Sequence, residues 1–138
     1  PYGMPRRTAV GFDYNRVNML LAILEKRLGM DFGTQDVYVN VVGGARVTEP
    51  AADLAVIAAI VSSYRNKPVM PGILAVGEVG LTGEVRRVGF VERRIKEAQN
   101  LGFQKFVTPT GNLSAKSLPT GIIQVNTVEE ALAAFFEK

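Results

Sequence analysis

The chain has 138 residues and a formal net charge of +3 at pH 7, and it contains neither cysteine nor histidine. This composition excludes disulfides, zinc sites built from cysteine and histidine, and every catalytic triad or general base that needs histidine. The length and the 47% share of hydrophobic residues are typical of one compact, soluble domain. A pI near 9.4 permits an anionic partner but does not require one.

The ends of the chain and its apolar runs predict a cytoplasmic protein without membrane contact. Residues 1–5 are rich in proline and are typical of the end of a linker, so we expect the domain to cover 6–138. The N-terminus does not resemble a signal peptide, and the longest apolar run, 54–61, is too short to cross a bilayer. The absence of cysteine also favours an intracellular protein.

The first third of the chain predicts a strand followed by an amphipathic helix. Residues 7–12 alternate in polarity as a strand does, and Asp13 or Asn15 can cap the helix behind it. Apolar side chains recur at helical spacing up to Leu28, and Gly29 is suited to end the helix.

A second strand is expected at 36–42, and the helix that follows it is the most apolar of the chain. Thr48 is a good N-cap for this helix, and Pro50 suits its first turn. Alanine, valine, isoleucine and leucine surround 54–61 on every side, which predicts a central helix covered by several other elements.

The remaining sequence predicts a hairpin, a helix, two strands and a last helix that begins with a capping box. The expected bounds are 73–79 and 84–88 for the hairpin strands, 91–101 for the helix, 104–109 and 121–125 for the two strands, and 127 onward for the last helix. Strands interleaved with helices predict an α/β fold, here an α+β sandwich in which helices pack on a mixed sheet.

Two separated motifs, 50–52 before an apolar helix and 77–85, resemble the proteolytic domain of Lon proteases, and the resemblance covers nearly the whole chain. Further matching positions are Val88, Gly89, Gly102, Phe103, Val107, Thr108, Pro109 and Asn112. The resemblance implies a Lon-like fold of the kind found in domain 2 of ribosomal protein S5. In that family a serine and a lysine form a catalytic dyad, and these two positions fall on Ala51 and Glu92.

The longer stretches 49–55 and 77–86, with both dyad residues replaced, are similar to the RadA (Sms) family of bacterial DNA repair and recombination ATPases. This resemblance implies a non-catalytic pseudo-protease domain that helps its parent protein assemble into a ring, expected to be a hexamer. It also implies possible DNA contact during branch migration and a role in the stress response. Members of this family carry a zinc finger and an ATPase core that use Zn, ATP and Mg. The chain has neither the cysteines nor a phosphate-binding loop, so we expect no cofactor and no metal in this domain.

The densest basic cluster has two interpretations. It consists of Arg86, Arg87, Arg93, Arg94 and Lys96, with Arg6 and Arg7 as further candidates. The cluster can form a face that contacts DNA phosphates, which would also suit a small nucleic-acid-binding domain acting alone. Alternatively it is a solvated surface, because Glu92 and Lys96, like Arg93 and Glu97, have the spacing of helical ion pairs.

Carboxylates and hydroxyls leave two further alternatives open. Glu49 and Asp53 flank the vacated serine position, but a metal site would need a third ligand, and acidic residues suit a first helical turn without one. An active Ser/Lys peptidase with a relocated dyad would pair Lys96 with another serine or threonine. The candidate serines, which also suit surface or capping positions, are Ser62, Ser63, Ser114 and Ser117.

Overall fold

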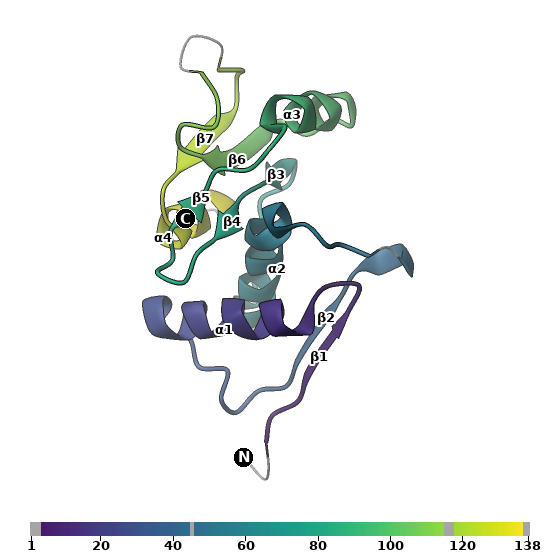
Figure 1. Ribbon diagram of the computed structural model, residues 1–138, viewed down its shortest axis with the longest axis vertical. Helices are drawn as coiled ribbons and strands as arrows, with labels where there is room; N and C mark the ends of the chain where they lie inside the picture. Colours follow the sequence, from purple (N-terminus) through teal and green to yellow (C-terminus); the bar gives the residue numbers. More distant parts are fainter. Residues whose placement is uncertain (1–3, 45, 115–117, 137–138) are drawn as a thin grey trace. The chain divides into compact units, whose positions relative to one another are not determined.

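The computed structural model describes residues 4–44, 46–114 and 118–136, so most of the expected linker 1–5 lies outside the described part. The chain falls into two compact units, 1–49 and 50–138, and each is described by itself. Figure 1 labels the elements of both units. The single domain expected over 6–138 stays a prediction.

Unit 1–49 is a strand–helix–strand unit. Its elements are β1 (Arg7–Val10), α1 (Tyr14–Leu28) and β2 (Val37–Asn40). The two strands pair in parallel, and the helix connects them (Figure 1). The Asp13 carboxylate accepts a hydrogen bond from the N–H of Arg16 at 3.0 Å, and Gly29 ends the helix with a left-handed φ of 68°. Both ends of α1 confirm the prediction, whereas both strands are shorter than expected.

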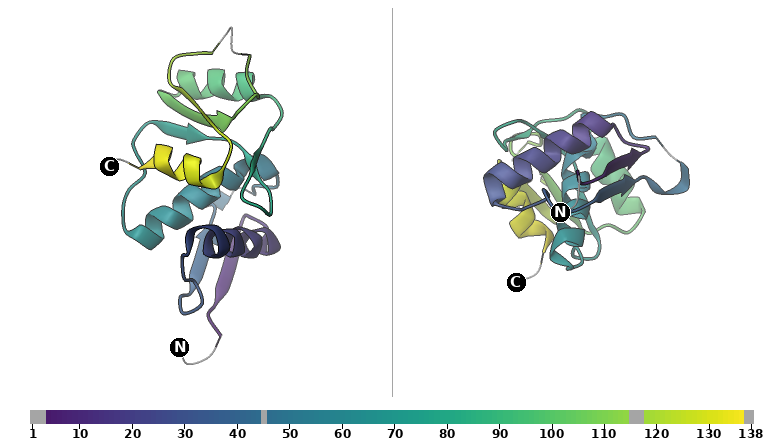
Figure 2. Two further views of the ribbon diagram at one scale, coloured as in Figure 1. Left: turned by 90° about the vertical axis from the view of Figure 1, so that its left-hand side faces the viewer. Right: turned by 90° about the horizontal axis from the view of Figure 1, so that it is seen from below.

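Unit 50–138 has a central parallel sheet between two layers of helices. Its elements are α2 (Asp53–Arg65), β3 (Ile73–Ala75), β4 (Glu78–Val79), β5 (Val85–Arg86), α3 (Val91–Asn100), β6 (Lys105–Pro109), β7 (Ile122–Val125) and α4 (Val128–Phe135). The sheet has the strand order β3-β6-β7. Figures 1 and 2 show α3 on one side of it and α2 with α4 on the other.

The helices that flank this sheet follow the expected patterns. The predicted inner face of α3 is buried and packs with Phe106 of β6 in one hydrophobic cluster. The residues of that face are Val91, Ile95 and Ala98. The capping box of α4 is also confirmed, because the Thr127 hydroxyl accepts a hydrogen bond from the N–H of Glu130 at 3.2 Å.

The prediction of a single mixed sheet is wrong. The described strands form three small sheets, of which β1-β2 and β3-β6-β7 are parallel and β4-β5 is antiparallel. The expected strand 73–79 is divided between two of them at Gly77. The backbone of Gly77 bonds to the turn before α2, with its N–H donating to Ala51 at 2.9 Å and its carbonyl accepting from Leu54 at 3.2 Å. This tertiary contact replaces the strand pairing that the local sequence favours.

The start and the environment of α2 also differ from the prediction. The helix begins at Asp53, behind a 3-10 turn at Pro50–Ala52, so Thr48 is not its N-cap. No side chain caps it, because Gly77 already satisfies the N–H of Leu54. The helix is not covered on every side either, since its methyl-bearing Ala55 and Ala59 are exposed. None of the described helices has the length and apolar character needed to cross a membrane.

Candidate functional site

Ala51 lies in the 3-10 turn before α2, where the resemblance places a catalytic serine. Its methyl group is 6% exposed and offers no attacking oxygen. Its carbonyl is engaged by Gly77 in the hydrogen bond described above. A Cβ atom on Gly77 would lie 2.8 Å from both Leu54 Cδ1 and Val85 Cγ1, so a larger residue does not fit where this segment crosses α2. The turn is therefore a packed junction.

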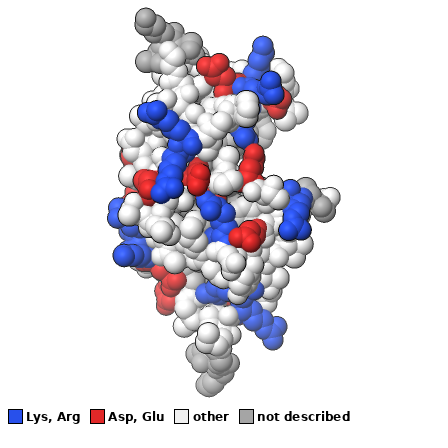
Figure 3. All heavy atoms as spheres, in the orientation of Figure 1, with Lys and Arg blue, Asp and Glu red and all other residues white. Residues whose placement is uncertain are grey.

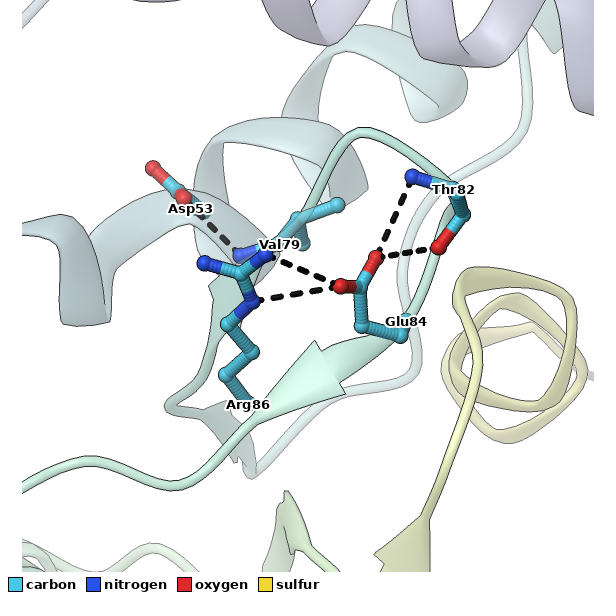
Figure 4. Close-up of polar contacts among 5 residues, drawn as sticks. All are labelled: Asp53, Val79, Thr82, Glu84 and Arg86. Carbon is cyan, nitrogen blue, oxygen red and sulfur yellow. Dashed lines mark hydrogen bonds and ion pairs between the residues drawn. The ribbon is translucent and has the colours of Figure 1, made fainter.

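Asp53, the first residue of α2, is fully buried beside this junction. Its Oδ2 atom accepts a hydrogen bond from the N–H of Val79 in β4 at 2.9 Å (Figure 4). A buried carboxylate needs such partners, and the positive end of the helix dipole favours its charge. Asp53 thus serves as a crosslink between α2 and the hairpin. Within the described ranges, no group of three or more acidic side chains is arranged to hold a metal ion.

The hairpin turn after β4 is organised around the Glu84 carboxylate (Figure 4). Its Oε1 atom accepts from the hydroxyl of Thr82 at 2.7 Å and from the N–H of Thr82 at 3.1 Å. Its Oε2 atom accepts from Nε and Nη2 of Arg86 at 3.2 and 3.0 Å. The Thr82 hydroxyl, the backbone of Glu84 and the Arg86 guanidinium together lower the pKa of Glu84 to about 2. A Cβ atom on Gly80 would collide with this carboxylate.

The same turn is fastened to the start of α4. The N–H of Val85 donates to the backbone carbonyl of Asn126 at 2.8 Å, and the N–H of Val128 donates to the carbonyl of Gly83 at 2.9 Å. The turn is therefore held at its base and by its own side chains, while Leu81 at its tip is 73% exposed.

Glu92, where the resemblance places the catalytic lysine, lies exposed in the first turn of α3. A carboxylate there is favoured by the helix dipole but offers no amine that could act as a base toward a serine. Among the described side chains, the structure records no ion pair between Glu92 and Lys96. Exposed pairs of this kind contribute little free energy, so nothing holds the two side chains together.

The predicted basic cluster lies on β5, on α3 and on the loop between them, but its members differ in their surroundings. Arg86 is paired with Glu84, and Arg94 donates from Nε to the carbonyl of Gly89 at 3.0 Å. Arg87 makes a long contact of 3.4 Å with the carbonyl of Thr110. Lys96 is exposed. Figure 3 shows basic side chains interspersed with acidic ones over β4, β5 and α3. On this face the described charges form a mixed surface.

The two further basic candidates belong to unit 1–49. Arg7 donates from Nη2 to the carbonyl of Phe32 at 2.6 Å and also contacts the carbonyl of Gln35. Arg6 is exposed, and its N–H donates to the carboxylate of Asp36 at 2.7 Å. The guanidinium of Arg7 thus serves to hold the segment before β2.

None of the described lysines is buried in the way that a base for one of the candidate serines would need. All four described lysines, at 26, 67, 96 and 105, are exposed. A lysine acts as a base at neutral pH when burial or a neighbouring charge lowers its pKa. Ser62 donates to the carbonyl of Lys67 at 2.6 Å, and Ser63 and Ser114 are exposed. Ser117 lies outside the described residues.

Two residues have roles that the sequence analysis missed. Asn112 clamps the loop before α3, because its Oδ1 accepts from the N–H of Val88 at 2.9 Å and its Nδ2 donates to the carbonyl of Val88 at 2.8 Å. Asn112 is one of the positions that match the Lon-like pattern, and this match is the only sequence feature that points to it. Phe90 precedes α3 with a left-handed φ of 61° and a side chain that is 75% exposed. No local sequence pattern indicates such a backbone conformation at a phenylalanine.

Comparisons with known proteins give the family. A family model described as subunit ChlI of Mg-chelatase matches residues 2–112. The DNA repair protein RadA of Bacillus subtilis is 50% identical over 133 residues, which cover 95% of this chain and 29% of that protein. RadA of Halalkalibacterium halodurans is 49% identical over 133 residues, with the same two coverages.

RadA of Streptococcus pneumoniae is 47% identical over 137 residues, which cover 98% of this chain and 33% of that protein. The chain thus spans about a third or less of the length of these relatives. The chain belongs to the ChlI family, as a Lon-protease-like domain of the RadA type.

Proposed function

We propose that the chain is a non-catalytic Lon-like domain of a RadA-type DNA repair protein, which contributes to a hexameric ring and contacts DNA. The observation that carries the proposal is the packed junction at Ala51. A methyl group stands where a peptidase of this type needs an oxygen, and the surrounding backbone is engaged in bonds to Gly77. Without a nucleophile and a base, the domain can act through its fold and its surface, by assembly and by binding.

The cations that suit DNA contact are the ones that pair with no carboxylate in the described part of the chain. Arg93 lies over an aromatic ring, and Arg87 and Lys96 are exposed. Arg86 contributes less, because Glu84 already balances its charge. Lysine and arginine contacts to phosphates release counterions, so their number is measurable from the salt dependence of binding. The RadA relatives are named as DNA repair proteins, which agrees with such a role.

A serine-directed covalent probe tests the non-catalytic part of the proposal, with an active Lon protease as the positive control. We expect no labelling of the wild-type chain. Ser62→Ala and Ser114→Ala serve as variants if labelling occurs. Labelling of one serine, together with peptide cleavage that its substitution abolishes, would contradict the proposal.

Salt-dependent DNA affinity tests the nucleic-acid contact with two variants that remove equal charge. Arg93→Ala/Lys96→Ala removes two cations of the cluster, and Lys26→Ala/Lys105→Ala removes two exposed cations elsewhere. Each lost phosphate contact makes the slope of log K against log salt shallower by about 0.7–0.9. We expect this change for the first variant alone. Equal effects of both variants, or a flat slope for the wild-type chain, would contradict a local contact by α3.

The mass of the chain in solution, measured over a range of concentrations, tests ring assembly. We expect a concentration-dependent species with the mass of six copies. A monomer at every concentration would contradict the proposal that this domain itself contributes the ring contacts.

A further inference from the structure

The loop before α3 presents an aromatic side chain in a disfavoured state. Phe90 has a φ of 61°, which bulky L residues rarely adopt, and burial does not compensate, because 75% of its side chain is exposed. A glycine would adopt the same backbone conformation without strain. The local structure thus gives no reason for a phenylalanine at this position.

Hydrogen bonds hold the backbone on both sides of Phe90, whose ring is exposed. The two hydrogen bonds from Asn112 fix Val88, and the carbonyl of Phe90 accepts the first helical bond from the N–H of Arg94 at 3.0 Å. The Arg94 side chain holds the carbonyl of Gly89. The Arg93 guanidinium lies 5.8 Å from the centre of the Phe90 ring, a cation–π contact that orients the ring at the surface.

Within four residues of Phe90 along the chain, four charged residues are arginines and one, Glu92, is acidic. Leu101, the exposed apolar residue at the other end of α3, is about 15 Å away along a helix of ten residues. A protein partner typically buries a contiguous apolar patch. A nucleic-acid base needs a single aromatic face, with cations beside it for the flanking phosphates. An exposed ring with the Arg93 guanidinium beside it therefore favours a base over a protein surface.

We propose that Phe90 stacks on an unpaired base of single-stranded DNA while Arg93 contacts a phosphate beside it. This inference rests on the proposed DNA contact of the domain. It adds that the DNA is single-stranded and that Phe90 is the side chain that selects it. Bases in a duplex are already stacked on one another, so an exposed ring at this position gains nothing from duplex DNA. Phe90 then distinguishes single strands from duplexes, and Arg93 binds both.

The absence of tryptophan from the chain makes a direct test possible. Phe90→Trp introduces a single tryptophan at the proposed stacking position, and Leu101→Trp introduces one at the far end of the same helix. The probes are an oligothymidine single strand and a duplex of equal length. We expect quenching of the tryptophan fluorescence by the single strand in Phe90→Trp alone, and no quenching by the duplex in either variant. Equal quenching in both variants would overturn the inference.

Affinities of Phe90→Leu supply the second test, with Leu101→Ala as the matched control. Loss of one stacked base weakens single-strand binding by about five- to 150-fold. We expect that loss for Phe90→Leu, with duplex affinity and salt slope unchanged. Unchanged single-strand affinity would overturn the inference and leave the proposed DNA contact intact. No binding of the wild-type chain to either DNA would refute the proposed contact itself. A Phe90→Leu variant that keeps its DNA affinity but changes its mass in solution would identify Phe90 as a protein contact and overturn the inference.

Discussion

The starts of α2 and α3 carry the two positions where the resemblance to Lon proteases places a catalytic dyad, and they are built in opposite ways. At α2 the methyl group of Ala51 and the carboxylate of Asp53 are buried, and both residues bond to the hairpin. At α3 the Glu92 carboxylate and the Phe90 ring are exposed. The comparison shows that the first of these positions is part of the core, while the second lies on the exposed surface.

The physical reason for the difference is the cost of burying polar groups. A buried N–H or carboxylate without a partner is costly, so every group at the start of α2 depends on a specific neighbour. Exposed charges at the start of α3 are solvated by water and depend on no neighbour. Substitutions at the first site should therefore change stability, and substitutions at the second should change binding.

The largest expected effect on stability comes from Asp53→Ala, which leaves the buried N–H of Val79 without its acceptor. We expect the free energy of unfolding to fall by about 2–3 kcal/mol, measured by urea denaturation. Glu92→Ala is the matched control at the exposed site, with an expected change within about 0.5 kcal/mol. Equal effects of the two substitutions would contradict the contrast between the two helix starts.

A smaller loss is expected for Asn112→Ala, which removes both hydrogen bonds to Val88. Because the site is only partly buried, water can replace part of the clamp, and we expect a loss of about 1–2 kcal/mol in thermal or urea unfolding. Asn112→Asp keeps the acceptor but places a negative oxygen against the carbonyl of Val88, so it should cost at least as much. If both variants were as stable as the wild type, Asn112 would not hold the loop that presents Phe90.

Glu84 predicts an acid-dependent contribution to stability. Its folded-state pKa of about 2 lies below the ordinary value of 4.5, so the unfolded chain takes up the proton first as the pH falls. The stabilisation is therefore complete above about pH 4.5 and is lost as the pH falls toward 2. Thr82→Val removes the largest cause, and an NMR titration of the carboxyl group should show the midpoint moving up toward 4.5. Leu81→Ala in the same turn should leave it unmoved, and a shift there would contradict the assigned cause.

The smallest expected effect separates stability from binding at Phe90. A glycine adopts the left-handed φ of this position without strain, so Phe90→Gly should raise the free energy of unfolding by about 0.5–1 kcal/mol. Thermal unfolding by circular dichroism measures this gain. A destabilised variant would show that the ring contributes to folding, which would weaken the contrast between the two helix starts.

The sequence alone determined the elements whose limits depend on local interactions. Asp13 and Gly29 mark the ends of α1, and Thr127 with Glu130 opens α4, because caps act within one helical turn. The inner face of α3 follows from helical spacing. The motifs also place the two dyad positions on Ala51 and Glu92, and this assignment stays a prediction.

Only the tertiary structure decided the features that depend on contacts between distant residues. The division of 73–79 into two strands and the late start of α2 both result from the meeting of Gly77 with Ala51 and Leu54. The buried hydrogen bond of Asp53 and the clamp on Val88 depend in the same way on partners 24 or more residues away, Val79 and Asn112. Local patterns are blind to such contacts, because the free energy of a buried hydrogen bond depends on which groups the fold brings together and not on the residues beside it in the chain.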